Sequence, residues 1–284
     1  MNTLDDIITS LPLIKQYHAR DTSLYRILEK IARQESEKMF DSSAAGGKSL
    51  GPVGEFYFPY YKMGAVDSID LFGLDELILF AFYWTNRKRY RKALDIGANI
   101  GLHTTVLSKC GYQVELFEPD PTHFAKLKEI LSANQIQGVV AHQAAVSDRS
   151  GHTEFVRVLG NTTSSHIAGC KQPYGELQKF QVPVFDIRKL IRSADLIKMD
   201  VEGHEATILE ATNSDDWNGV DAVIEVGAPD KAKLIFNHMQ KIGVRAFSQK
   251  TGWKEIKILE EMPFSYKDGS LFLSKKTSMP WDPF

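Results

Sequence analysis

Cysteine is scarce in this chain: only Cys110 and Cys170 occur among 284 residues. Two cysteines give no disulfide framework, and a reducing cytoplasm is the simpler expectation. An excess of positive charge is also missing, because 34 basic residues face 36 acidic ones and leave a net charge of −2. This balance supplies no general attraction to nucleic acid or to an anionic membrane.

Long apolar runs are missing as well. The most apolar stretch, Leu71 to Trp84, is too short to span a bilayer and contains Asp75 and Glu76, so we expect a buried helix there. Met1 to Ser10 carries two acidic residues and lacks the basic start of a secretory signal. A chain of 284 residues suits one large domain, or one domain with an appendage.

A glycine-rich turn follows a short apolar strand at Leu94–Gly101, which reads Leu-Asp-Ile-Gly-Ala-Asn-Ile-Gly. A helix over Ile100–Cys110 comes next, and the strand Gln113–Phe117 then delivers a carboxylate at Glu118. This order of strand, turn, helix, strand and acid is typical of a nucleoside site. The acid holds the ribose hydroxyls, and the charged remainder of the cofactor lies over the turn.

The turn lacks the middle glycine of a dinucleotide-binding motif. Asn99 occupies that position, and His103 stands near the place of the third glycine. A pyrophosphate fits poorly over these side chains. A cofactor with an amino-acid tail fits better, and S-adenosylmethionine is such a cofactor; a turn that binds nothing is the alternative. The expected cofactor contacts are Asp95, Gly97, Asn99, Gly101 and Glu118.

Helical and strand patterns alternate from about Leu74 to Lys241, which favours a mostly parallel sheet with helices on both faces. The seven strands that we expect in it are Lys92–Ile96, Gln113–Phe117, Val139–His142, Leu196–Met199, Ala222–Val226, Val244–Ser248 and Ser270–Ser274. Thr153–Val158 and Phe180–Phe185 can form an extra strand pair inserted before the fourth of them.

The first 74 residues have a different pattern. Thr22–Phe40 has apolar residues at helical spacing, and Leu4–Tyr17 predicts a shorter helix interrupted at Pro12. Asp41–Gly54 has the composition of a linker, and the aromatic-dense Glu55–Lys62 predicts strands or an edge segment. We expect residues 1–74 to form a helical extension that covers the substrate or pairs subunits, and residues 75–284 to form the cofactor-binding domain.

A second group of ionisable residues follows the strand Leu196–Met199, in the run Asp-Val-Glu-Gly-His-Glu over 200–205. Ligands of open parallel sheets bind beyond the carboxyl ends of the strands, so Asp200 is the best candidate to face the reacting centre and to contact the cofactor. Glu225 repeats this position one strand along.

These ionisable residues can have different roles in the reaction. Asp200 or His204 can act as a general base, with Glu225 orienting it, and Glu202 can contact the substrate. The alternative is that Glu202, His204 and Glu205 only cap the helix that follows and meet solvent. Asp200 and Glu225 also match a divalent metal in ligand type, but two carboxylates are too few ligands, so we predict no metal site.

Two further segments complete the expected site. Ala144 and Ala145 follow the third strand, where small residues let an adenine ring approach. The polar loop over 161–166 offers Ser164, Ser165 and His166 to a hydroxylated substrate. An ordinary exposed loop is an equal alternative for this segment.

Together these pieces resemble the FkbM-type family of S-adenosylmethionine-dependent methyltransferases. The matching segments lie in the family's order and cover roughly Ala93 to Val226. They are 94–101, 117–121, 144–148 and 198–205, and Glu225 follows them. The resemblance implies a class I methyltransferase fold, which is an α/β, Rossmann-like fold. It also implies methyl transfer to oxygen atoms of sugars, polyketides and related small molecules.

We therefore expect an S-adenosylmethionine-dependent methyltransferase (EC 2.1.1.-) that O-methylates a hydroxyl of a sugar, a glycan or a related small molecule. A polyketide-type metabolite and a nitrogen acceptor are alternatives within this class. A nicotinamide-dependent oxidoreductase and a non-catalytic cofactor-binding protein are alternatives outside it. The near-neutral charge, and the absence of an Asn/Asp-Pro-Pro-aromatic tetrapeptide, argue against a nucleic-acid substrate. A homo-oligomer is a further hypothesis for this chain.

Overall fold

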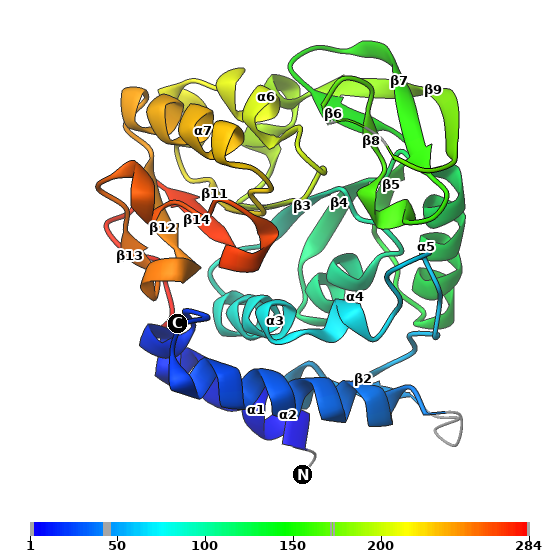
Figure 1. Cartoon of the computed structure of the whole chain (residues 1–284), viewed down its shortest axis with the longest axis vertical. Coiled ribbons are helices and arrows are strands. Elements are labelled where there is room, and N and C mark those ends of the chain that lie inside the picture. The colour runs from blue at the N-terminus through cyan, green and yellow to red at the C-terminus, as the bar shows by residue number, and fades with distance from the viewer. Residues whose placement is uncertain (1–2, 42–46, 171, 173, 283–284) are drawn as a thin grey trace.

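The structure is a computed structural model that describes residues 3–41, 47–170, 172 and 174–282. Its centre is an eight-stranded sheet (Figure 1). From edge to edge the strands are β13 (Lys254–Glu255), β12 (Arg245–Ser248), β14 (Leu271–Ser274), β11 (Asp221–Ile224), β10 (Leu196–Met199), β3 (Lys92–Ile96), β4 (Gln113–Phe117) and β5 (Val140–His142). The strands from β11 to β5 are parallel, whereas β14 runs antiparallel to its neighbours β11 and β12.

This strand order, with one reversed strand between β11 and β12, is the class I methyltransferase arrangement, so the predicted mostly parallel α/β fold is confirmed. All seven predicted strands are present. The sheet has one strand more than predicted, because β13 is two residues long and too short to leave a periodic pattern. β11 ends at Ile224 and not at Val226, which leaves Glu225 just beyond the strand.

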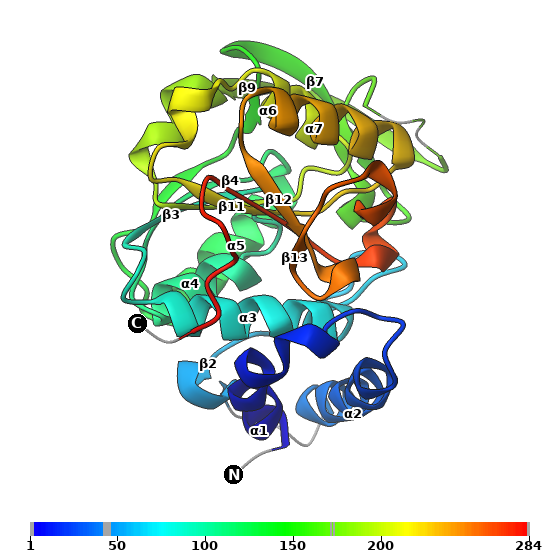
Figure 2. The same ribbon diagram turned by 90° about the vertical axis from the view of Figure 1, so that its left-hand side faces the viewer.

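Helices cover both faces of the sheet, as Figure 2 shows. Those on one face are α3 (Leu74–Asn86), α4 (Leu102–Lys109) and α5 (Pro121–Ala133), and those on the other are α6 (Glu205–Glu210) and α7 (Pro229–Lys241). The pleat of β3 divides its side chains between two apolar clusters, with Ala93 in one and Leu94 in the other. α3 is buried as predicted, and none of the described helices is long and apolar enough to cross a membrane.

The N-terminal helices pack on the outer side of α3 (Figures 1 and 2). They are α1 (Thr3–Ser10), a 3₁₀ helix over Leu11–Tyr17 and α2 (Ser23–Met39). The break predicted at Pro12 is present, because Pro12 stands in the first turn of the 3₁₀ helix. The hydroxyl of Thr22 accepts the backbone N–H of Tyr25 at 3.2 Å and so caps α2.

The predicted linker over 41–54 falls partly outside the described residues. Its described part is more regular than expected, since β1 (Lys48–Ser49) pairs antiparallel with β2 (Glu55–Phe56). The strand expected in the aromatic-dense segment that follows is therefore present, but it is short. The boundary that we predict between residues 74 and 75 stays a prediction.

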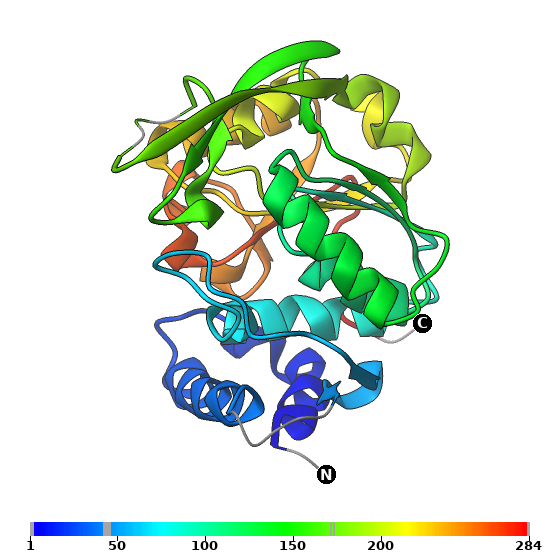
Figure 3. The same ribbon diagram turned by 90° about the vertical axis from the view of Figure 1, so that its right-hand side faces the viewer.

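A second sheet has four strands and lies on the face of the central sheet that α6 and α7 cover, whereas α5 covers the opposite face (Figure 3). In order they are β6 (Ala145–Ser147), β9 (Leu177–Asp186), β7 (Gly151–Val158) and β8 (His166–Ile167). β7 and β9 are the predicted extra pair, and they pair antiparallel along the whole of β7. In the segment after β5, Ala145–Ser147 forms β6 because β9 offers it a parallel partner.

The loops after three neighbouring strands are held in register. Ile96, Met199 and Ile224 are partners at the strand ends. The N–H of Asp200 then donates to the carbonyl of Ile96 at 3.0 Å, and that of Glu225 donates to Met199 at 3.0 Å. Gly97 turns away with a φ of 81°, and a Cβ on it would lie 1.8 Å from the carbonyl oxygen of Asp200. The close approach of these two loops therefore requires glycine at position 97.

His18 joins the N-terminal helices to the last part of the chain. Its Nε2 lies 3.0 Å from the carbonyl of Leu11, and its Nδ1 accepts the indole N–H of Trp253 at 2.8 Å. The ring of Trp281 packs edge-on against it. Because Nδ1 accepts, this pattern needs the neutral ring. Burial lowers the pKa of His18 to about 4.

We expect His18 to reduce stability in acid. Its pKa is about 4 in the folded chain, against a usual value of 6.5, so the unfolded chain binds the extra proton between these values. The contribution of His18 is complete above pH 6.5 and falls by roughly 3 kcal/mol as the pH drops toward 4. Urea unfolding of the wild type and His18→Gln should show a stability gap that shrinks in acid. A gap independent of pH would contradict this.

Gly97→Ala should destabilise the fold far more than the matched control Gly111→Ala. Both glycines have a left-handed backbone, but a Cβ at 111 meets nothing within 4 Å. Conformational strain alone should cost about 1–2 kcal/mol at Gly111, whereas the added clash at Gly97 should raise the loss above roughly 4 kcal/mol. Equal losses of free energy of unfolding in urea titrations would show that the close approach at 97 is unimportant.

Candidate active site

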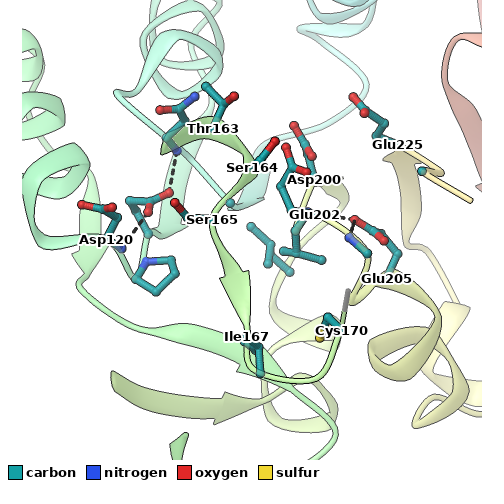
Figure 4. Close-up of a pocket in the computed structure, with 18 of the residues that line it drawn as sticks. Asp120, Thr163, Ser164, Ser165, Ile167, Cys170, Asp200, Glu202, Glu205 and Glu225 are labelled. Carbon is teal, nitrogen blue, oxygen red and sulfur yellow. Dashed lines mark hydrogen bonds between the residues drawn. The ribbon is translucent and has the colours of Figure 1, made fainter. Parts of the chain in front are cut away.

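A cavity lies at the carboxyl ends of the parallel strands, where the ligand is predicted to bind. Its volume is about 860 Å³, enough for a nucleoside cofactor with a small acceptor. The wall comes from the ends of β3, β4, β10 and β11, from the second sheet and from the segment before α3. Figure 4 shows acidic and hydroxyl side chains gathered around it.

The turn after β3 and the acid after β4 are joined through the backbone. Both carboxylate oxygens of Glu118 accept backbone N–H groups, Oε2 from Asn99 at 2.7 Å and Oε1 from Asp120 at 2.8 Å. Burial raises the pKa of Glu118 to about 8, although these two amides act to lower it. Hydroxyl groups of a ligand would add further donors and favour the carboxylate.

The cavity wall contains most of the predicted cofactor contacts, namely Gly97, Asn99, Glu118, Ala144, Ala145 and Asp200. Asp95 lies beneath the turn instead, fully buried, with the hydroxyl of Thr104 donating to it at 2.5 Å. Gly101 faces α5, because a Cβ on it would lie 2.8 Å from Cγ of Leu127. These two residues shape the turn from below and do not line the cavity.

Lys198 is the cation beneath this edge of the sheet. Its Nζ donates to the carbonyl of Gly97 at 3.1 Å and lies 3.7 Å from Oδ2 of Asp200 and 3.8 Å from Oδ1 of Asp95. Burial by itself lowers the pKa of Lys198, but the surrounding carboxylates, Asp200 foremost, raise it overall. The ammonium therefore stays charged and ties the glycine turn to the end of β10.

Three acids that we predicted at the reacting end, Asp200, Glu202 and Glu225, all line the cavity. Burial, and then the carboxylates of Asp200 and Glu202, raise the pKa of Glu225 well above its usual value. Glu225 therefore takes up a proton more readily than an ordinary glutamate does. Among the described residues, no group of three histidine, cysteine or acidic side chains has the geometry to hold a metal ion.

Glu205 is buried, contrary to the reading in which it meets solvent. Its Oε1 accepts the N–H groups of Val201 and Gly203 at 2.9 and 3.2 Å, which closes the turn between β10 and α6. Its Oε2 has no hydrogen-bond partner in the described part of the chain. Glu205 therefore builds the turn that presents Asp200 and Glu202 to the cavity.

His204 lies behind the cavity wall. Its Nε2 pairs with the hydroxyl of Ser147 at 2.8 Å and its Nδ1 with Sγ of Cys170 at 3.0 Å. Because Ser147 donates to Asp148 at 2.9 Å, it accepts from Nε2–H, and Nδ1 accepts from the thiol. Burial lowers the pKa of His204. Of the two predicted bases, only Asp200 reaches the cavity directly.

The predicted substrate loop contributes most of its residues to the wall. Ser164 and Ser165 line the cavity, together with residues 161–163. His166 is buried, with Nδ1 at 2.9 Å from the carbonyl of Ser164, and it stands behind the wall. The hydroxyl of Ser165 accepts the N–H of Val158 at 3.2 Å, so the loop is fixed to β7.

Sequence reasoning missed several wall residues. They are Glu76 from α3, Cys170, and the aromatic residues Phe155, Tyr174 and Tyr266. Glu76 carried a signal, because an acid within a buried apolar helix needs a partner or a use. The aromatic residues come from segments whose position depends on tertiary packing, so periodicity gives no indication of them.

Comparison with known proteins identifies the family of this chain. The family model described as the methyltransferase FkbM domain matches residues 95–247. "Methyltransferase 1" of Beauveria bassiana (strain ARSEF 2860) is 25% identical over an alignment of 154 residues, and the match covers 46% of this chain and 62% of that protein. The chain thus spans about three fifths of that relative's length.

Two solved structures are also similar to this chain. An S-adenosylmethionine-dependent methyltransferase from Agrobacterium tumefaciens has a TM-score of 0.41 and 11% identity, over 81% of this chain and 70% of that one. A putative O-methyltransferase from Klebsiella pneumoniae has a TM-score of 0.36 and 11% identity, over 68% and 78%. The family match covers more than half of the sequence. This chain therefore belongs to the FkbM methyltransferase domain family.

Proposed function

We propose that this chain transfers the methyl group of S-adenosylmethionine to a hydroxyl group of a sugar, a glycan or a related small molecule. One observation carries the proposal. Glu118, which has two acceptor oxygens, and the acids Asp200 and Glu225 line one cavity from opposite sides of the glycine turn. In this proposal a nucleoside site and a proton-accepting site meet at the end of β3.

The residues present fit the cofactor. Glu118 can accept from the two ribose hydroxyls, and Ala144 and Ala145 leave room for a flat base. Asn99 offers its Oδ1, which has no hydrogen-bond partner among the described residues, to the amino-acid tail. When bound, S-adenosylmethionine supplies an electrophilic methyl group on a sulfonium sulfur that leaves readily. The chain then has two tasks, to align the acceptor and to take its proton.

Asp200 performs the second task in this proposal. It lines the cavity at the end of β10, and Lys198 fixes it from below at 3.7 Å. Asp200 removes the hydroxyl proton as the oxygen attacks the methyl group. Glu225 stands at the end of the neighbouring strand, and its raised pKa suits it to share that proton. His204 supports the same wall through Cys170.

The acceptor side of the wall favours a hydroxylated molecule without negative charge. Residues 161–165 supply amide and hydroxyl groups, and Tyr174 and Tyr266, 57% and 59% exposed, supply aromatic faces for a sugar ring. The acids of the described wall outnumber its single lysine, Lys231, and they are Asp70, Glu76, Glu118, Asp120, Asp200, Glu202, Glu205, Glu225 and Asp230. A phosphorylated acceptor would be repelled.

The chemistry of the cavity wall also favours some of the alternative functions over others. Its acidic lining would also suit a nitrogen acceptor that carries positive charge, and a polyketide-type metabolite needs only the hydroxyl groups. A nicotinamide-dependent oxidoreductase has less support, because a pyrophosphate would have to lie over Asn99 and beside several carboxylates. A cytoplasmic location and a homo-oligomer stay predictions.

Glu118→Ala and Asp200→Asn should separate cofactor binding from turnover. Glu118→Ala removes the acceptors of the ribose hydroxyls, so affinity for S-adenosylhomocysteine, measured by calorimetry, should fall at least about tenfold. Asp200→Asn keeps the shape of the side chain but removes the carboxylate that accepts the proton. Turnover of an acceptor found with methyl-labelled cofactor should fall roughly 10²- to 10⁴-fold, with product affinity changed less than about tenfold.

Glu210→Gln, on the exposed side of α6, is the matched control and should change neither quantity. Unchanged product affinity in Glu118→Ala would count against the ribose assignment. Full turnover by Asp200→Asn would remove that residue from the chemistry.

Neutral acceptors should be better substrates than their phosphorylated counterparts. The excess of carboxylates in the wall repels a phosphate, so kcat/KM for a sugar phosphate should be at least about tenfold below that of the parent sugar. Added salt should narrow the difference, because it screens the repulsion. Matched sugar and sugar-phosphate pairs in a labelled-methyl assay measure this. A phosphate that improves kcat/KM would contradict the electrostatic argument.

A further inference from the structure

We propose that Glu76 binds the ammonium group of the cofactor's amino-acid tail. This inference rests on the proposed function, because it assigns a residue to the same cofactor. Glu76 lies in the first turn of α3, outside the segment matched by the family model. It lines the main cavity together with Gly97 and Asn99, and the small adjoining pocket together with Lys198 and Asp200.

The carboxylate of Glu76 is held in one orientation. Its Oε2 lies 2.7 Å from Nε2 of His103, and Nδ1 of the same ring lies 3.0 Å from the hydroxyl of Tyr83. A carboxylate can only accept, so Nε2 carries the proton; in the neutral ring Nδ1 then accepts from Tyr83. Among the described residues Oε1 has no hydrogen-bond partner. One oxygen is thus fixed from behind, and the other remains available to a ligand.

The first turn of α3 is fastened on its outer side as well. The neighbouring Asp75 accepts from the hydroxyl of Tyr25 at 2.7 Å and from the side-chain amide of Gln249 at 2.5 Å, and it pairs with Arg20. The N-terminal helices therefore hold the helix end that presents Glu76. Adjacent acids face opposite ways, with Asp75 toward the extension and Glu76 toward the cavity.

Charge favours this assignment. Burial alone raises the pKa of Glu76, but the imidazole of His103 and then the ammonium of Lys198 lower it overall, so the carboxylate stays ionised. A buried ammonium needs an anionic partner. Asp95, the acid that the sequence offers first, is fully buried beneath the turn. Asp200 is paired with Lys198. Glu76 is thus an ionised wall residue whose outer oxygen can accept.

A competing explanation is that Glu76 only stabilises the N-terminus of α3, where negative charge is favourable. That role requires neither a cavity nor a bound ligand. The two explanations differ in which ligands depend on Glu76. An ammonium partner affects only ligands that carry the amino-acid tail, whereas a structural acid affects every ligand of the cavity equally.

Calorimetry with two ligands separates the two explanations for Glu76. S-adenosylhomocysteine carries the tail, and 5′-methylthioadenosine has the same nucleoside and thioether without it. Glu76→Gln should weaken S-adenosylhomocysteine by roughly 10- to 100-fold, as expected for loss of a charged hydrogen bond, and leave 5′-methylthioadenosine within about twofold. Glu76→Asp keeps the charge but withdraws it by one methylene, so its loss should be intermediate and equally confined to the tailed ligand.

Glu115→Gln is the matched control. Glu115 also pairs with a histidine, His142, at 2.9 Å with 30% of its side chain exposed, against 31% for Glu76, but it is not in the cavity wall. It should change neither affinity. Equal weakening of both ligands by the Glu76 variants, or no weakening of S-adenosylhomocysteine, would overturn the assignment. If the wild type binds neither ligand, the proposed function itself fails.

Discussion

The carbonyl oxygen of Asp200 occupies the space that a side chain at residue 97 would need. This close approach brings the turn after β3 against the end of β10, and Lys198 bridges the two from below by its contacts with Gly97 and Asp200. The part of the site that would hold a cofactor tail and the part that would take a proton are therefore one connected unit. Their relative position is set by backbone packing.

The cavity is acidic, and the structure gives its acids different partners. Glu118 accepts two backbone amides and Glu205 closes a turn, while Asp95, beneath the cavity wall, accepts a hydroxyl and lies near an ammonium. These contacts offset the cost of placing carboxylates away from water. The acids that stay toward the cavity, Asp200 and Glu225 among them, can then respond to a ligand. In the proposed reaction a cationic cofactor would reduce the repulsion between these carboxylates, and proton uptake by one of them would compensate when methyl transfer removes that positive charge.

Much of this site can be read from the sequence, because strand ends, glycines and acids follow one another in a fixed order. That reasoning placed Gly97, Asn99 and Glu118 on the cavity and put Asp200 beside Glu225. It failed where contacts come from distant parts of the chain. The side of the wall on which His204 lies depends on Ser147 and Cys170, and β6 depends on its partner β9. The neighbours of Glu76 depend on how the whole of α3 packs, and the sequence alone does not show that packing.

His18 and Trp253, which touch in the folded chain, are 235 positions apart. Such a contact closes a very long loop, and topologies rich in distant contacts fold slowly. The apolar cluster around α3 takes residues from both early and late parts of the sequence, from Leu4 to Trp281. Residues up to Trp281 must therefore leave the ribosome before that cluster can close. The N-terminal helices belong to the same core as the sheet, and a nascent chain carries them without their late partners until those partners have emerged.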